Sequence, residues 1–125
     1  MNKNILVIEE AENMRRILFR LYENHRPYDT LYFASNVQEA IAMLVTTKPD
    51  LILTDLSIEG ICGFDFVKKV RSHSSTKDIP VIIISSESQM KYMEKGKEAG
   101  ANGWLVRPIN PESLENFNTR FLDPT

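Results

Sequence analysis

The stretch LILTDLSIEGICGFDFVKKVR, residues 51–71, contains the strand, loop and helix from which the fold can be predicted. The apolar run at its start is too short to be a helix by itself and predicts a strand that ends at Asp55. Gly60 and Gly63 predict a loop after this strand. The apolar spacing from about Phe64 to Arg71 predicts a helix. The stretch therefore predicts one strand–loop–helix unit.

The same unit, a short apolar run followed by a helical pattern, occurs five times along the chain. Because helices separate the strands, the connections must be crossovers, which predicts a parallel sheet. Because the strands are continuous apolar runs, helices should cover both faces of the sheet. The prediction is an α/β domain with a doubly wound, five-stranded parallel sheet and five helices. The predicted strands are residues 5–8, 31–33, 51–53, 81–84 and 104–106, and the predicted helices cover about 14–22, 37–45, 64–71, 90–99 and 111–122.

Local signals predict where several of these helices begin and end. Pro27 should end the first helix, and Asn36 should be the N-cap of the second. Gly100 should end the fourth helix, and Pro111 suits the first turn of the fifth.

Composition narrows the class of protein. The length of 125 residues predicts one domain over residues 1–125, whose output must come from its own surface. The chain has 15 Lys and Arg against 17 Asp and Glu, and the net charge of −2 argues against binding to nucleic acid. The single cysteine, Cys62, cannot form an internal disulfide, which favours a cytoplasmic protein. The apolar runs are far shorter than the about 20 residues of a membrane-spanning helix.

Side chains with carboxylate, hydroxyl or guanidinium groups follow four of the predicted strands. Glu9 and Glu10 follow the first strand, Asp55 ends the third, Ser85 follows the fourth and Arg107 follows the fifth. Ligands of such sheets bind beyond the carboxyl ends of the strands, near the point where the strand order reverses. We therefore expect these side chains to meet at one edge of the sheet.

This set of side chains suits phosphoryl chemistry. Clustered carboxylates raise one another's pKa, and a hard cation such as Mg²⁺, which prefers oxygen ligands, relieves their repulsion. A carboxylate such as that of Asp55 can act as a nucleophile and form an aspartyl-phosphate. The Ser85 hydroxyl can donate to a phosphoryl oxygen, and Arg107 can hold one bidentately.

Four segments in this order resemble the receiver domain of two-component response regulators, of the single-domain chemotaxis type. The segments are ILVIEEAENMRRIL at 5–18, LILTDLSIEGICGFDFVKKVR at 51–71, IPVIIISS at 79–86 and AGANGWLVRPI at 99–109. The resemblance implies a flavodoxin-like fold with strand order 2-1-3-4-5. It also implies that Asp55 accepts a phosphoryl group from a phosphohistidine, on a histidine kinase or a phosphotransfer protein. The metal site implied by the resemblance consists of Glu9, Glu10, Asp55 and the backbone carbonyl of Ser57.

The resemblance further implies a switch and an output surface. Ser85 and Arg107 would bind the phosphoryl group, and Trp104 would change rotamer in response. From its sequence position alone, Trp104 fits a half-buried strand aromatic equally well. Ser57 and Glu87 would tune the lifetime of the phosphoryl group. Helix four, strand five and helix five would form the face for a downstream protein target, and the Arg107–Pro108 peptide bond would be cis.

Three departures from the family pattern give a second hypothesis. The acidic pair is Glu9-Glu10 instead of Asp-Asp or Glu-Asp, Arg107 replaces a lysine, and Glu59 stands where proline is usual. The arginine keeps the charge but is bulkier and planar, so it is not equivalent to an ammonium. The alternative is a pseudo-receiver, an interaction module that works without phosphorylation. A flavodoxin-like cofactor binder is disfavoured, because no glycine-rich phosphate loop follows the first strand.

Overall fold

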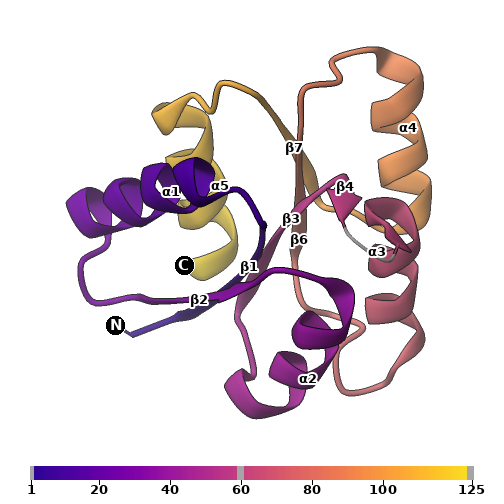
Figure 1. The fold of residues 1–125 in the computed structure, drawn as a ribbon, viewed down its shortest axis with the longest axis horizontal. Coiled ribbons are helices and arrows are strands. Elements are labelled where there is room, and N and C mark those ends of the chain that lie inside the picture. The colour runs from indigo at the N-terminus through magenta and orange to yellow at the C-terminus, as the bar shows by residue number, and fades with distance from the viewer. Residues whose placement is uncertain (1, 59–60, 124–125) are drawn as a thin grey trace.

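The computed structural model describes residues 2–58 and 61–123, and its helices and strands alternate along the chain (Figure 1). The strands are β1 (Asn4–Ile8), β2 (Thr30–Ala34), β3 (Leu51–Asp55), β4 (Ser57–Ile58), β5 (Ile61–Cys62), β6 (Val81–Ser85) and β7 (Gly103–Val106). The helices are α1 (Glu12–His25), α2 (Val37–Thr47), α3 (Gly63–Ser72), α4 (Met90–Ala99) and α5 (Pro111–Leu122).

The main sheet has five parallel strands in the order β2-β1-β3-β6-β7. Counted among these five strands alone, this is the predicted order 2-1-3-4-5. The order reverses between β1 and β3, which are hydrogen-bonded neighbours although β2 lies between them in the sequence. The prediction of a doubly wound parallel sheet is confirmed, and the edge at the strands' carboxyl ends is the expected place for a site.

Two separate hydrophobic cores lie on the two faces of the sheet. Helices α1 and α5 cover one face, and α2, α3 and α4 cover the other (Figure 1). Successive strand residues point to opposite faces, so Leu6 and Ile8 belong to the core under α2, α3 and α4, whereas Ile5 and Val7 belong to the core under α1 and α5. All four are fully buried, as the continuous apolar runs predict.

The predicted helix boundaries agree with the structure. The Asn36 side chain accepts the Glu39 backbone N–H at 2.9 Å, so it is the N-cap of α2. Gly100 ends α4 with a φ of 112°, in the left-handed region that favours glycine. Pro111 is the first residue of α5, and the Arg107–Pro108 peptide bond is cis. None of the helices in the described residues is long and apolar enough to cross a membrane.

The segment after Asp55 differs from the simple loop that was predicted. It contains an antiparallel pair of short strands, β4 and β5, in which Ser57 is the partner of Cys62. The next residue, Gly63, begins α3 in close contact with the end of β3, since a Cβ atom there would lie 2.9 Å from the Asp55 carbonyl oxygen. The small size of Gly63 therefore allows α3 to start beside Asp55. Glu59 lies outside the described residues.

Candidate functional site

The carboxyl ends of β1, β3, β6 and β7 meet at one edge of the sheet. Register pairs Asp55 with Ile84, so the end of β3 lies directly beside the end of β6, where Ser85 is buried. The Arg107 backbone N–H, just after β7, donates to the Ser85 carbonyl at 2.9 Å. Glu9 continues β1 by donating its N–H to the Ala34 carbonyl at 2.9 Å. The parallel register thus brings together residues that are far apart in the sequence.

Glu9 is the buried acid of this edge. Its side chain is 3% exposed, and one carboxylate oxygen, Oε1, lies 2.5 Å from Arg107 Nη2. The other oxygen, Oε2, accepts the Ala11 backbone N–H at 3.1 Å. Burial raises the pKa of Glu9 above its ordinary value, and the charge of Asp55 raises it further, while the Ala11 hydrogen bond and Arg107 oppose the shift.

Asp55 is the accessible acid of the site. Its side chain is 15% exposed, and its Oδ2 lies 3.4 Å from the same Arg107 Nη2 that binds Glu9. Its Oδ1 accepts the Ser57 backbone N–H at 3.3 Å. One guanidinium nitrogen therefore bridges the two carboxylates. The Nε of Arg107 is buried and has no hydrogen-bond partner within the described part of the chain.

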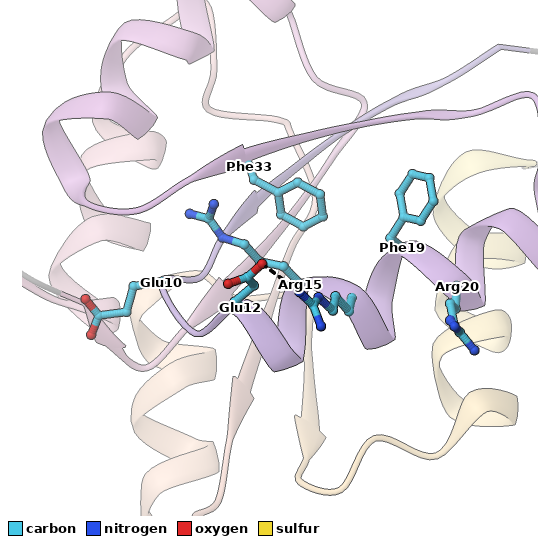
Figure 2. A pocket seen from close by; sticks show the side chains of 7 residues that line it. Glu10, Glu12, Arg15, Phe19, Arg20 and Phe33 are labelled. Carbon is cyan, nitrogen blue, oxygen red and sulfur yellow. Dashed lines mark hydrogen bonds and ion pairs between the residues drawn. The ribbon is translucent and has the colours of Figure 1, made fainter.

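Glu10 does not join this cluster. It is exposed, and its carboxylate extends away from Arg15 and Phe33 (Figure 2). Across residues 2–58 and 61–123, no three His, Cys, Asp or Glu side chains converge in a way that would hold a metal ion. The oxygen donors that Mg²⁺ prefers are nevertheless present, as the carboxylates of Glu9 and Asp55 and the backbone carbonyl of the exposed Ser57. The donor chemistry fits the metal, but the Arg107 guanidinium already lies against the carboxylates of both Glu9 and Asp55.

Two hydrogen bonds connect Ser85 to Trp104. The Glu87 backbone N–H donates to Ser85 Oγ at 3.0 Å, and the Glu87 carbonyl accepts the Trp104 indole N–H at 2.8 Å. The half-buried Trp104 ring also packs 6.2 Å from the Phe64 ring centroid and directly against Gly96 of α4. Trp104 is therefore a packed strand aromatic that is also linked to the site.

Arg15 is a residue of this edge that the sequence analysis missed. Its Nε donates to the Glu9 carbonyl at 2.5 Å, its Nη2 donates to Ser35 Oγ at 2.5 Å, and its guanidinium lies 5.4 Å from the Phe33 ring centroid. These contacts hold the loop that carries Glu9. In the sequence Arg15 is one charged residue on the polar side of an amphipathic pattern, which is typical of a solvated side chain.

An open groove of 670 Å³ lies beside Glu10, along α1 and β2 (Figure 2). The exposed ring of Phe19 forms part of its wall. The lining residues are Glu10, Glu12, Arg15, Arg16, Phe19, Arg20 and Phe33.

A family profile described as the response regulator receiver domain matches residues 5–117 of the chain. The chain belongs to the response regulator receiver family. This receiver domain is 29% identical to the chemotaxis protein CheY-3 of Vibrio cholerae over 117 residues, which are 92% of this chain and 89% of that protein. It is 30% identical over 112 residues to the phosphate regulon transcriptional regulatory protein PhoB of Pseudomonas aeruginosa, where the match covers 90% of this chain. The receiver domain spans about half of PhoB, since the match covers 48% of that longer protein.

Solved structures agree with the fold of this receiver domain. The chemotaxis response regulator CheY4 of Vibrio cholerae superposes with a TM-score of 0.87 at 28% identity, covering 97% of this chain and 99% of that one. The receiver domain of a sensor histidine kinase from Pseudomonas aeruginosa has a TM-score of 0.85 at 16% identity, covers 98% and 99% of the two chains, and holds a magnesium ion in its active-site cleft. The second likeness concerns the fold alone. The prediction of a flavodoxin-like receiver domain of two-component signalling is confirmed.

Proposed function

We propose that Asp55 of this receiver domain accepts a phosphoryl group from a phosphohistidine of a histidine kinase or phosphotransfer protein, in the cytoplasm. The observation that carries the proposal is the position of Asp55. It is a partly exposed carboxylate at the end of β3, with the guanidinium of Arg107 at 3.4 Å and Ser85 at the end of the next strand.

The chemistry of the transfer follows from these groups. A carboxylate oxygen of Asp55 attacks the phosphorus, the phosphorus–nitrogen bond of the phosphohistidine breaks, and its electron pair remains on the imidazole. The negative charge on the phosphoryl oxygens is stabilised by positive charges and hydrogen-bond donors that the protein holds in position. Arg107 supplies a positive charge beside Asp55, and the Ser85 hydroxyl supplies a hydrogen-bond donor.

The proposed metal ligands are the oxygen atoms identified above together with Glu10, whose exposed carboxylate would have to turn toward the ion (Figure 2). Glu9, Glu10, Asp55 and the Ser57 carbonyl would hold Mg²⁺, with water completing its coordination. When bound, Mg²⁺ supplies positive charge that neutralises the phosphoryl oxygens. Ser57 and Glu87, two residues beyond Asp55 and Ser85, are proposed to affect how long the phosphoryl group survives.

The signal is proposed to travel from Ser85 to Trp104. A Ser85 hydroxyl that turns to a phosphoryl oxygen pulls on the Glu87 backbone, whose carbonyl holds the Trp104 indole N–H. A movement of this ring against Gly96 would alter the surface formed by α4, β7 and α5, which we propose as the contact face for a downstream protein.

One observation favours the second candidate function, a phosphorylation-independent interaction module. The Arg107 guanidinium donates to the Glu9 carboxylate at 2.5 Å, and the Glu10 side chain is exposed. If this site is not phosphorylated, the protein keeps one conformation. Partner binding then depends only on the surface of that conformation.

Intact mass spectrometry after incubation with Mg²⁺ and acetyl phosphate tests the proposed function. The wild-type protein should gain about 80 Da, the mass of one phosphoryl group. Asp55→Asn should abolish this gain, because an amide oxygen is a poor nucleophile. Asp65→Asn, which changes an exposed aspartate of α3, should keep it. A folded wild-type protein that gains no mass, or a gain that persists in Asp55→Asn, would contradict the proposal.

A further inference from the structure

Strand β2 forms one edge of the main sheet, and part of its backbone is open to a further strand. Among the described residues, β1 is the only strand that pairs with it. The Thr30 N–H donates to the Lys3 carbonyl at 2.9 Å, so the backbone groups of Thr30 face β1. In a parallel ladder this direction alternates from residue to residue. The N–H and C=O groups of Leu31 and Phe33 therefore point away from β1.

The sequence of β2 lacks the features that usually protect an edge strand. Many exposed edges carry a charged side chain, a proline or a bulge, each of which discourages pairing with another chain. Residues 30–34 read TLYFA, with no charge and no proline, and their register with β1 is continuous. Leu31, Tyr32 and Phe33 are all only half-buried. Strand β2 can therefore accept an extended peptide as an added strand.

The groove between α1 and β2 offers apolar contacts to such a strand. The Phe33 side chain lies on the sheet face that α1 covers, and the Phe19 ring of α1 is 52% exposed (Figure 2). Between these rings the Arg15 guanidinium is held by Ser35 Oγ and the Glu9 carbonyl, 5.4 Å from the Phe33 centroid. The groove is thus formed before a ligand binds, which lowers the entropic cost of binding.

The charges along the groove favour an acidic ligand. Figure 2 shows Glu10 at one end and Arg20 at the other, beside Phe19. The Arg20 side chain is exposed. Arg16 lies 3.0 Å from Glu12, but the two side chains are 72% and 76% exposed, so this ion pair is weak and a ligand can replace it. The end of the groove beside Phe19 is therefore complementary to carboxylates.

From this geometry we propose that the groove between α1 and β2 binds an acidic peptide segment of a partner protein, which adds to β2 as an extended strand. The outer N–H and C=O groups of Leu31 and Phe33 bind its backbone. Every second side chain of the peptide faces α1, where an apolar side chain packs between the Phe19 and Phe33 rings and acidic side chains meet the arginines of α1. This surface lies apart from the face formed by α4, β7 and α5, and its use does not depend on phosphorylation of Asp55.

Fluorescence polarisation with a labelled synthetic peptide tests the site. The peptide has phenylalanine at its centre, glutamate two positions to either side and threonine elsewhere. Wild-type protein should bind it at least about tenfold more tightly than the same peptide with lysine in place of glutamate. Phe19→Ser and Arg20→Glu should each weaken binding at least about fivefold, because aromatic and arginine side chains dominate the affinity of interfaces. Ile41→Ser, which changes an exposed apolar residue of α2, should bind like wild type.

A second peptide tests the requirement for alternating side chains. Its phenylalanine is moved by one position, which keeps the composition but places the ring on the other side of an extended chain. This peptide should bind at least about fivefold more weakly. Equal binding of the two peptides, or no binding of the first by folded wild-type protein, would overturn the proposal. Circular dichroism checks that each variant is folded.

Amide hydrogen exchange followed by NMR identifies the added strand. The peptide should protect the N–H groups of Leu31 and Phe33, whereas the Thr30 N–H, which already donates to Lys3, should change little. Binding without protection at Leu31 and Phe33 contradicts strand addition. Protection of these amides without peptide, in a protein that sediments as a dimer, shows that a second copy of the chain occupies the edge and overturns the proposal.

Discussion

At the scale of single residues, two pairs of polar side chains bind each other inside the protein. Glu9 and Arg107 form one pair at the sheet edge, and Tyr22 of α1 and Asn118 of α5 form another between these two helices. A buried ion pair contributes little net stability, because desolvation offsets its attraction, but removal of one partner leaves an unpaired buried group. The Glu9–Arg107 pair is therefore expected to add little to the stability of the fold, although loss of Arg107 alone would leave the buried Glu9 unpaired.

Tyr22→Phe should lower the free energy of unfolding by about 1–3 kcal/mol, the cost of an unsatisfied buried polar group. Tyr22 is 2% exposed, and its hydroxyl donates to Asn118 Oδ1 at 2.7 Å, so phenylalanine would leave that oxygen without this donor. The same burial raises the pKa of Tyr22 above its ordinary value, so the hydroxyl is the donor at neutral pH. Urea denaturation measures the change. Tyr28→Phe is the matched control, because Tyr28 is 76% exposed, and an equal loss in both variants would contradict the prediction.

At the scale of helices and strands, hydrogen bonds between residues close in the sequence mark the starts of α2 and α5. Two of the helices begin at asparagine N-caps, Asn36 and Asn110, whose side chains accept backbone N–H groups of the first turn. In α2 the Glu39 side chain also reaches back to the Ser35 backbone N–H at 2.7 Å. These contacts involve residues within four positions of one another, which is why sequence patterns predict them.

Asn36→Ala should lower the free energy of unfolding by about 1 kcal/mol, the usual value of an N-cap side chain. The alanine removes the acceptor of the Glu39 N–H, which lies 2.9 Å from Asn36 Oδ1. Thermal and urea unfolding measure the effect. Asn36→Asp keeps an acceptor at the same place and should unfold close to wild type. If the alanine and aspartate variants were equally destabilised, the side-chain cap would not be the cause.

At the scale of the whole molecule, contacts between distant segments join α1 and α5, the two helices on one face of the sheet (Figure 1). Arg26, just after α1, binds Asp29 beside β2 and makes two contacts of 2.7 and 3.0 Å with Asp123 after α5. The Arg26 guanidinium, through these hydrogen bonds, holds the pKa of Asp123 below its ordinary value of 3.8. The Arg26–Asp123 ion pair therefore joins the ends of α1 and α5, in addition to the apolar core between these helices.

Asp123→Asn should lower the melting temperature slightly at neutral pH, and the difference from wild type should shrink in acid. A carboxyl group with a lowered pKa stabilises the folded state above its unfolded-state pKa, and this contribution is lost as the pH falls through the folded-state value. The effect is small because Asp123 is exposed to solvent. Melting curves between pH 7 and pH 3, with Asp65→Asn as the control, measure it. A difference that stays constant below the ordinary value of 3.8 would argue against a role for the charge.

The amino-acid sequence by itself determined the five strands of the main sheet, the five helices and the helix ends marked by Asn36, Gly100 and Pro111. The same pattern predicted which residues reach the functional edge, because parallel strands joined by crossovers must present their carboxyl ends together. This is why Glu9, Glu10, Asp55, Ser85 and Arg107 were predicted to meet from their positions alone, although Glu10 does not join the other four. The short β4–β5 pair was missed, because two-residue strands carry no periodic signal.

Only the tertiary structure decided how these side chains share the site. Glu9 and Glu10 are adjacent and chemically identical, yet Glu9 is buried against Arg107 and Glu10 is exposed. Successive side chains of an extended chain point to opposite sides, and the sequence does not say which side meets a residue 98 positions away. The contacts of Arg15 and the Tyr22–Asn118 hydrogen bond could not be predicted for the same reason. Side chains distant in sequence find their partners only when the two helical layers close on the sheet.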